Sequence, residues 1–317
     1  MRRIIFDVDT GSDDALEVIY AYCSRKMDIK GITTIFGAYS IDETTKHTLQ
    51  IVDMLNCNIP VYKGCSRSLT RHLYPQMLQT SENNKLIGDR KIGYHEVFSD
   101  SFPKHKCEET HAVTYLINEL TDSKDKITIV TSGALTNIAS VIRLRPELKK
   151  NIQEIVIMGG GINVANKTSA SEGNFYRDPE AARIVLESGC NIFLIPLDAT
   201  MKVPLCKEDA DKIKNKGTKV AEFVSNVIET RIEAYNSLVN SEKKGNAYVH
   251  DLLCTFYLLD PSVISETVHY DATVSISFDE AAGKLLVDQR EGRIKPNLNI
   301  AINVDKDKYM DLLFNSI

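Results

Sequence analysis

The sequence predicts an α/β fold, in which residues 1–317 form a single domain with a mostly parallel, open β-sheet flanked by helices and a Rossmann-like core. Three observations support this prediction. Short β-rich runs alternate with helical patterns, which is typical of a parallel sheet covered by helices. No internal repeat, low-complexity tract or linker divides the chain. Its 317 residues, 43% of them hydrophobic, also suffice to bury a large core.

The predicted elements follow one another in a regular order. Runs rich in Ile, Val, Thr and Phe predict strands at 2–8, 29–36, 59–63, 126–132, 154–160 and 191–197. Apolar periodicity predicts helices at 13–24, 42–55, 109–121, 134–150 and 178–189. In the last helix, Asp178 is expected at the N-cap, Pro179 at the first position and Gly189 at the C-terminal stop. Residues 65–108 and 160–177 match no regular element, and such long loops are usually functional or mobile.

Composition argues against several classes of protein. The formal net charge of −5 gives no reason to expect a nucleic-acid or membrane partner. No 18-residue apolar stretch predicts a membrane span, and the first residues do not resemble a signal peptide. The seven cysteines contain no CxxC pair, which favours free thiols in a reducing cytoplasm. We therefore expect a cytoplasmic protein without a nucleic-acid or membrane partner.

The polar residues of greatest interest follow the predicted strands. Asp7 to Asp14 follow the first strand, Gly37-Ala38 the second, Ser132-Gly133 the fourth, and Gly159 and its successors the fifth. Because open parallel sheets bind ligands at the carboxyl ends of their strands, these segments are expected to share one site.

The first of these segments, DVDTGSDDA (7–15), holds four carboxylates within eight positions. Asp7 and Asp9 lie on one face of a strand, and Asp13 and Asp14 begin a helix. Helix capping accounts for one acid, for which Asp13 is the candidate, but not for four. Clustered carboxylates repel one another unless a cation lies among them, so the string predicts a site for a hard cation such as Ca²⁺ or Mg²⁺.

One interpretation of this string is phosphoryl transfer. DVDT matches the DxDxT signature of haloacid-dehalogenase-like phosphatases, with Asp7 as nucleophile, Asp9 as acid/base and Mg²⁺ as cofactor. That signature fixes few positions and leaves Asp13 and Asp14 without a role.

The full string DxDxGxDDA instead resembles the N-terminal signature of the inosine-uridine preferring nucleoside hydrolase family. VTSGALTNIA (130–139), IMGGGINVANKTSASEGNFYRDPEAA (157–182) and HDLLC (250–254) are similar to later segments of that family, in the same order. The resemblance implies a nucleoside hydrolase-like fold and a Ca²⁺-dependent enzyme of purine or pyrimidine salvage. Its reaction would be hydrolysis of the N-glycosidic bond of a ribonucleoside to free base and ribose.

The resemblance also implies a metal site. Asp9, Asp14 and Asp251 would bind one Ca²⁺ through carboxylates, and Ser132 through its backbone carbonyl. Asp9 would also act as the general base that takes a proton from a Ca²⁺-bound water. Asp7 would support the site without touching the substrate.

The remaining implied roles concern the substrate. Asp13 would hydrogen bond the ribose. Asn166, Glu172 and Asn174 would hold its other hydroxyls, including the 5′-OH. His250 would donate a proton to the departing base, because a histidine pKa usually lies near neutrality. Family members are commonly dimers or tetramers, so a homodimer or homotetramer is expected.

The sequence departs from the family pattern at two positions. Ala38 replaces an Asn beside the metal, which keeps a second function open: a nucleoside- or ribose-binding homologue with lost or altered catalysis. Gly173 replaces a bulky residue on the 5′ side of the sugar, so a larger or different substituent could fit there. Tyr94, His95 and Tyr235 are candidates for the base pocket, and the absence of Trp argues against base activation by stacked tryptophans.

Overall fold

The computed structural model describes residues 1–74, 97–237, 242–290 and 297–317. Its strands are β1 (Arg2–Val8), β2 (Met27–Thr34), β3 (Val61–Lys63), β4 (Ile127–Thr131), β5 (Ile152–Met158), β6 (Ile192–Ile195), β7 (Ile264–Val274), β8 (Leu285–Asp288) and β9 (Leu298–Val304). They form one sheet in the order β3-β2-β1-β4-β5-β6-β9-β7-β8. Neighbours from β3 to β9 are parallel, whereas β7 is antiparallel to both β9 and β8. The predicted α/β fold with a mostly parallel sheet is confirmed.

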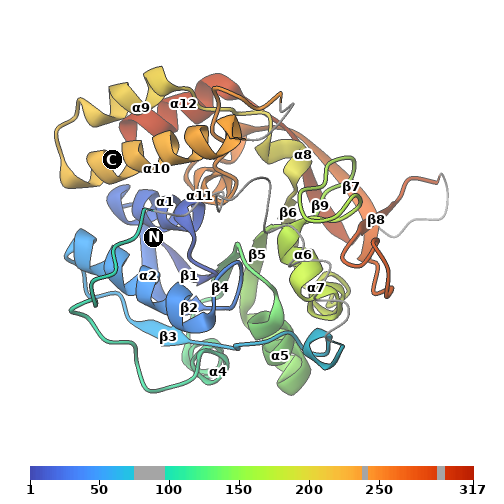
Figure 1. The fold of residues 1–317 in the computed structure, drawn as a ribbon. Helices are drawn as coiled ribbons and strands as arrows, with labels where there is room; N and C mark the ends of the chain where they lie inside the picture. Colours follow the sequence, from blue (N-terminus) through green and yellow to red (C-terminus); the bar gives the residue numbers. More distant parts are fainter. Residues whose placement is uncertain (75–96, 238–241, 291–296) are drawn as a thin grey trace.

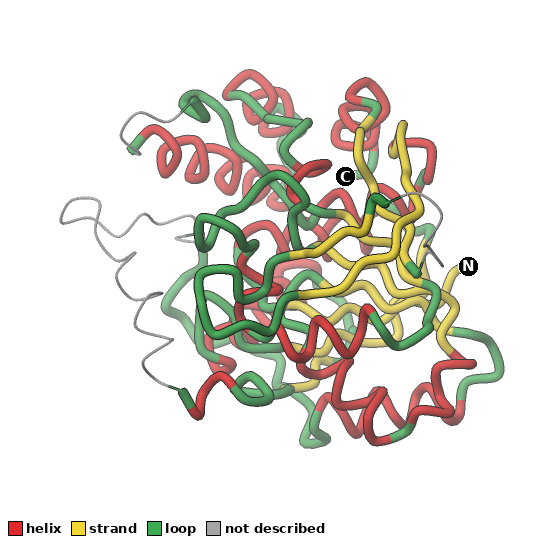
Figure 2. The backbone as a smooth tube through the Cα atoms, turned by 90° about the vertical axis from the view of Figure 1, so that its right-hand side faces the viewer, coloured by secondary structure: helices red, strands yellow, loops and turns green. Residues whose placement is uncertain are grey.

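Helices cover both faces of the sheet (Figures 1 and 2). The helices are α1 (Ser12–Cys23), α2 (Ile41–Leu55), α4 (Ala112–Asp122), α5 (Thr136–Leu144), α6 (Gly173–Arg177), α7 (Pro179–Leu186), α8 (Leu197–Thr200), α9 (Lys207–Lys214), α10 (Lys219–Asn236), α11 (Leu252–Leu259) and α12 (Lys306–Asn315), with 3₁₀ turns η1 (Arg71–Leu73), η3 (Pro146–Asn151) and η4 (Pro261–Val263). Helices α1, α2 and α9 to α12 share one hydrophobic core with the sheet, and α4, α5 and α7 share the other. Within the described ranges, no helix is long and apolar enough to cross a membrane.

Strand β1 separates the two cores by its alternation. Ile4, Phe6 and Val8 pack into the core that contains α1, whereas Ile5 packs into the core that contains α5. Asp7 has the same parity as Ile5 and therefore points toward α5. The chain then leaves the sheet and enters α1, which places the following acids at the carboxyl edge of the strands.

The helix predicted over 134–150 is wrong in its extent. It ends at Leu144, and residues Pro146–Asn151 form a 3₁₀ turn instead. The cause is Pro146, which disfavours the helical conformation at Arg145, whose φ and ψ are −139° and 68°. The predicted cap at Asp178 is confirmed, since its side chain accepts a hydrogen bond from the Ala181 N–H.

Two stretches predicted to lack regular structure contain short helices. The stretch 65–108 contains η1, and its residues 75–96 lie outside the described residues. The stretch 160–177 ends in α6, whose N-cap is Glu172.

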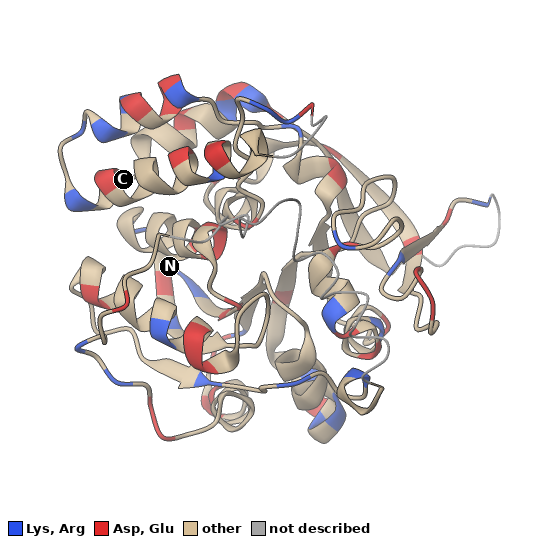
Figure 3. Ribbon diagram, in the orientation of Figure 1, with Lys and Arg blue, Asp and Glu red and all other residues tan. Residues whose placement is uncertain are grey.

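Basic residues are scattered among acidic ones over the outer helices and loops (Figure 3), in keeping with the net charge of −5.

Candidate active site

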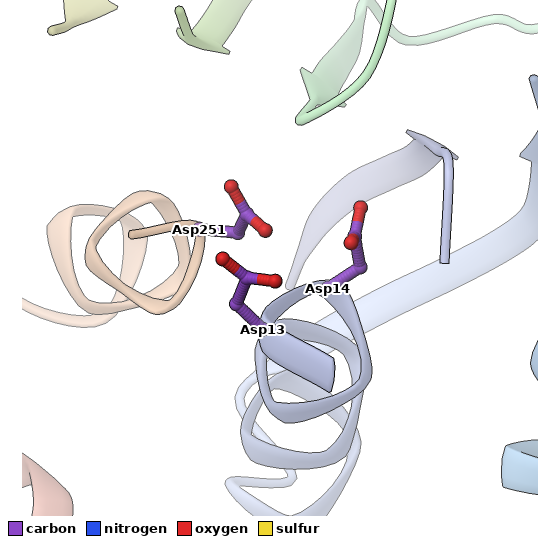
Figure 4. A group of neighbouring side chains, drawn as sticks. All are labelled: Asp13, Asp14 and Asp251. Carbon is purple, nitrogen blue, oxygen red and sulfur yellow. The ribbon is translucent and has the colours of Figure 1, made fainter. Parts of the chain in front are cut away.

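Three acids meet where α1 and α11 begin. Asp13 and Asp14 lie in the first turn of α1, and Asp251 is the N-cap of α11 (Figure 4). All three are buried, and each offers a carboxylate oxygen within 4.8 Å of those of the other two. The structure thus brings together Asp14 and Asp251, two of the predicted metal ligands, and adds Asp13, which was assigned to the ribose.

The electrostatics of this group favour a bound cation. Burial, and then repulsion from the neighbouring carboxylates, raises the pKa of Asp14 and of Asp251 well above the usual value. Ionising several neighbouring carboxylates in a buried position costs free energy unless a cation lies among them. Hard divalent cations prefer oxygen ligands of this kind. The donor set therefore fits Ca²⁺ or a similar ion.

The acid that caps α1 is Asp14 rather than Asp13. Asp14 accepts a hydrogen bond from the Gly11 N–H at 2.9 Å, and its other oxygen lies 3.0 Å from the Ser132 hydroxyl. The same hydroxyl lies 2.8 Å from Glu17 Oε2. The Ser132 side chain thus links the end of β4 to two acids of α1, a role beyond the backbone contact that the sequence predicted for it.

Glu17 belongs to the site, although the sequence did not single it out. It is fully buried, and burial raises its pKa to about 8, so it is mainly protonated at pH 7. Its position three residues after Asp14 places it one helical turn further along the same face. The three-residue spacing of Asp14 and Glu17 was the only sequence signal for this role. The same spacing also occurs when an acid lies on the exposed face of an amphipathic helix.

Asp9 follows β1 and is pressed against the loop after β2. A Cβ added to Gly37 would lie 1.6 Å from Asp9 Oδ2, so only glycine fits there. The backbone N–H of Ala38 hydrogen bonds to Asp9, and Arg177 Nη1 lies 3.5 Å from its Oδ2. Burial raises the pKa of Asp9, and the charge of Arg177 lowers it. Asp9 lies near the acids of α1, but the tight group described above does not include it.

Asp7 lies behind the other acids. It is fully buried, and its Oδ1 accepts hydrogen bonds from the Thr33 hydroxyl at 2.6 Å and from Asn137 Nδ2 at 2.8 Å. Burial raises its pKa to about 7. A phosphatase nucleophile must reach its substrate, so this burial argues against the DxDxT interpretation. The buried position of Asp7 is consistent with the predicted role of supporting the site without touching the substrate.

Glu172 is held by backbone donors. Its carboxylate accepts hydrogen bonds from the N–H groups of Gly160, Asn174 and Phe175 at 2.7 to 3.2 Å. These contacts fix the loop after β5 to the start of α6. Burial raises the pKa of Glu172, and these N–H groups oppose that rise.

Asn174 joins the ends of two strands. Its Nδ2 donates to the carbonyls of Ser132 at 2.7 Å and of Met158 at 3.1 Å, and its Oδ1 accepts from Arg177 Nη1 at 2.8 Å. Asn166 is exposed, and its Oδ1 accepts from the Gly173 N–H. Of the predicted sugar-binding residues, Asn174 thus contacts Ser132, and Glu172 and Asn166 hold the backbone at the start of α6.

His250 does not have the pKa that the sequence suggested. Its Nδ1 lies 2.7 Å from the Thr200 hydroxyl, and the side chain is buried. Burial, and then the charge of Arg231, lowers the pKa of His250 to about 3. The expectation of a near-neutral pKa was wrong, and the imidazole is uncharged at pH 7.

Sequence reasoning missed two arginines that reach the site, Arg177 of α6 and Arg231 of α10. Arg231 Nη1 lies 3.2 Å from Asp13 Oδ1 and 3.0 Å from Ser12 Oγ, and its Nε donates to the Tyr248 carbonyl. No sequence pattern distinguishes a buried arginine of a long helix from an exposed one, so Arg231 carried no signal.

The candidates for a base pocket are only partly described. Tyr94 and His95 lie outside the described residues. Tyr235 is buried on α10, and its ring meets that of Tyr248 edge to face with centroids 5.5 Å apart. This contact is consistent with packing as well as with binding.

Comparison with known proteins confirms the resemblance. A family described as inosine-uridine preferring nucleoside hydrolase matches residues 4–311. The chain is 29% identical to an inosine-uridine preferring nucleoside hydrolase of Leishmania major, across all of this chain and 97% of the relative. It is 32% identical to the pyrimidine-specific ribonucleoside hydrolase RihA of Citrobacter koseri, over 98% and 96% of the two chains. A solved purine-preferring ribonucleoside hydrolase from Gardnerella vaginalis superposes with a TM-score of 0.85 at 27% identity, over 99% and 98% of the two chains.

Proposed function

Because this chain belongs to the inosine-uridine preferring nucleoside hydrolase family, we propose that it hydrolyses the N-glycosidic bond of a ribonucleoside, releasing the free base and ribose. The observation that carries the proposal is the buried group of Asp13, Asp14 and Asp251 at the carboxyl edge of the sheet. Relatives named for purines and for pyrimidines are both similar to this chain, so they give no preference for either base.

We assign a Ca²⁺ ion to the carboxylates of Asp9, Asp14 and Asp251 and to the backbone carbonyl of Ser132. The donor set supports this assignment, because it consists of oxygen atoms only and includes acids whose pKa is raised by burial and then by mutual repulsion. When bound, Ca²⁺ would supply the positive charge that offsets this repulsion and lowers the pKa of a nearby water.

In this proposal Asp9 is the general base. It takes a proton from the attacking water as the water oxygen bonds to C1′ of the ribose. Burial raises the pKa of Asp9 and so makes it a better proton acceptor than an exposed carboxylate. Gly37 and the Ala38 N–H hold the side chain in place.

The other polar residues bind the sugar. Asp13, fixed by Arg231, would accept a hydrogen bond from one ribose hydroxyl. Asn166, Glu172 and Asn174 would hold the others, including that at C5′. Cleavage develops positive charge on the sugar ring, and buried carboxylates stabilise that charge more strongly than water does.

His250 completes the assignment on the side of the base. An imidazole that is neutral at pH 7 is a poor proton source, so we assign it a hydrogen bond to the departing base rather than full proton transfer. With the Thr200 hydroxyl donating to Nδ1, the imidazole proton is on Nε2, which can then donate.

The direct test uses a panel of purine and pyrimidine ribonucleosides with Ca²⁺ present. Release of ribose and free base from at least one of them is expected. Tight binding of ribose without release from any nucleoside would instead support the binding-protein alternative, which Ala38 motivates. Phosphate release from phosphate esters, with a phosphorylated Asp7, would support the phosphatase alternative.

A further inference from the structure

Arg177 lies in the site, yet the proposed reaction gives it no role. Its Nη1 donates to Asn174 Oδ1 at 2.8 Å and lies 3.5 Å from Asp9 Oδ2. Among the described residues, its Nε and Nη2 groups have no hydrogen-bond partner, and 21% of its side chain is exposed. The guanidinium therefore retains N–H groups that can bind a ligand entering the site.

Gly173 leaves space next to this guanidinium. A Cβ added at Gly173 would lie 3.4 Å from Arg177 Nη1 and 3.8 Å from Asn166 Oδ1, so a larger side chain would fill the region between them. Gly173 does not have a positive φ, and its backbone thus permits other residues. The absence of a side chain at Gly173 therefore leaves a space beside the Arg177 guanidinium.

A second cation lies close to the first. Lys167 is half-buried in the loop after β5, and its pKa is lowered by burial and then by the charge of Arg177. Asp9 already pairs with Arg177, and an anion in the space beside Gly173 would gain further attraction from both positive charges.

Arg177 also opposes the chemistry of an uncharged substrate. A guanidinium beside Asp9 weakens the binding of a cation by that carboxylate and destabilises positive charge on the sugar. A substrate that brings negative charge to the guanidinium removes both penalties. Phosphate suits this position, because arginine binds phosphate oxygens through pairs of N–H groups.

We propose that Arg177 and Lys167 form a subsite for the phosphate of a ribonucleoside 5′-monophosphate, in the space that Gly173 leaves open. This inference rests on the proposed function, which assigns Asn166, Glu172 and Asn174 to the sugar hydroxyls. The water oxygen bonds to C1′ and gives one proton to Asp9, the base leaves with the electron pair of the C1′–N bond, and the proton that Asp9 releases passes through solvent to the base. The second product is ribose 5-phosphate. The phosphate ester is not cleaved.

The test compares kcat/KM for inosine and uridine with kcat/KM for their 5′-monophosphates, with Ca²⁺ present and release of base measured. The wild-type protein is expected to prefer the monophosphates by about tenfold or more. Arg177→Met should lower the monophosphate rates about 10- to 100-fold, the usual range for lost charge-assisted hydrogen bonds. It should raise the nucleoside rates, because a charge that opposes the transition state is gone.

Two further variants sharpen the comparison. Gly173→Leu should exclude the phosphate and reduce monophosphate turnover more than nucleoside turnover. Arg183→Met is the matched control, because the Arg183 side chain on α7 is 42% exposed and pairs with Glu187. It should leave both activities unchanged.

The outcomes separate this inference from the proposed function. A wild-type preference for nucleosides, with Arg177→Met lowering both substrates equally, would overturn the phosphate subsite and leave the hydrolase intact. If no substrate is cleaved, calorimetric titration with ribose 5-phosphate and with ribose decides. Tighter binding of ribose 5-phosphate that Arg177→Met abolishes would support the subsite, and equal binding of the two would refute it.

Discussion

At the scale of single residues, the proposed reaction depends most on Asp9. It is the acid that touches the loop after β2, the acids of α1 and Arg177, so three parts of the chain determine its position. A carboxylate placed in this way serves as a base only while it can ionise. The amide of asparagine has nearly the same shape but cannot accept the proton.

Asp9→Asn is therefore expected to reduce kcat by about 10²- to 10⁴-fold, the range usual for loss of a general base, and to leave the fold intact. Ribose release and circular dichroism measured on the same preparation check this prediction. Full activity in a folded Asp9→Asn protein would remove Asp9 as the base.

His250 gives a second prediction at this scale. His250→Ala should slow nucleosides with poor leaving groups much more than a p-nitrophenyl riboside, whose leaving group needs little help. Because the pKa of His250 is about 3, the pH profile of kcat/KM between pH 5 and 8 should have the same shape with and without the imidazole. An equal loss of activity on nucleosides and on the p-nitrophenyl riboside would contradict the assigned role. So would a limb of the kcat/KM pH profile that is present in the wild type and disappears in His250→Ala.

At the scale of elements, the site exists because several connections converge on one edge of the sheet. The turn from β1 into α1 supplies the acids, and the end of β4 supplies Ser132, whose hydroxyl contacts two of them. The segment after β5 supplies Glu172, which is the N-cap of α6, and Asn174 in the first turn of that helix. The loop after β2 contributes mainly space, through the glycine that Asp9 packs against.

Gly37→Ala tests this contribution. The added methyl group would clash with Asp9 Oδ2, so activity should fall about 100-fold, as expected for a catalytic group displaced by about 1 Å. Gly217→Ala is the control, because Gly217 has a φ of 69° but no heavy atom within 4 Å of an added Cβ. It should cost about 1 kcal/mol of stability and no activity. Full activity of Gly37→Ala would show that Asp9 has another position open to it.

At the scale of the whole molecule, the buried acids make stability depend on pH. The folded-state pKa values of Asp7 and Glu17 are raised to about 7 and about 8, so folding favours their protonated forms. The stability this provides is complete below pH 4 and is lost as pH rises through 7 and 8.

The free energy of unfolding of the metal-free protein should therefore fall by a few kcal/mol between pH 5 and pH 8, since one pKa unit corresponds to about 1.4 kcal/mol. Saturating Ca²⁺ should reduce this loss, because the cation favours the ionised form of the acids around it. Urea unfolding at several pH values, with Ca²⁺ and with a chelator, measures both effects. Metal-free stability that rises from pH 5 to pH 8 would contradict this view of the acids.

Much of the architecture was predictable from the sequence. The strand at 2–8 matches β1 at both ends, since its apolar run is short and bounded by charged residues. The antiparallel edge, β7 with β8, was not predicted, because the polar, half-exposed sequence of β7 lacks the apolar run of a buried strand. The helix predicted to run to residue 150 ends earlier, because the apolar periodicity continues past Pro146 although proline disfavours helix at the residue before it.

The candidate site was predictable where the chain itself brings residues together, as in Asp13 and Asp14. The approach of Asp251 required a likeness to known proteins, because more than 200 positions separate it from α1. Arg177, Arg231 and Glu17 were missed for a physical reason. Whether a charged side chain of a helix is buried depends on the elements packed against it, and local sequence does not specify them.

In the proposed reaction, a cation held by these acids is required to cleave the N-glycosidic bond. The most direct measurement is the rate of ribose release from the best nucleoside substrate after complete metal removal, followed by titration with Ca²⁺. Release is expected to stop without metal, to return as Ca²⁺ is added, and to fail to return in the Asp14→Asn and Asp251→Asn variants. Ribose release that persists at an undiminished rate after complete metal removal would contradict it.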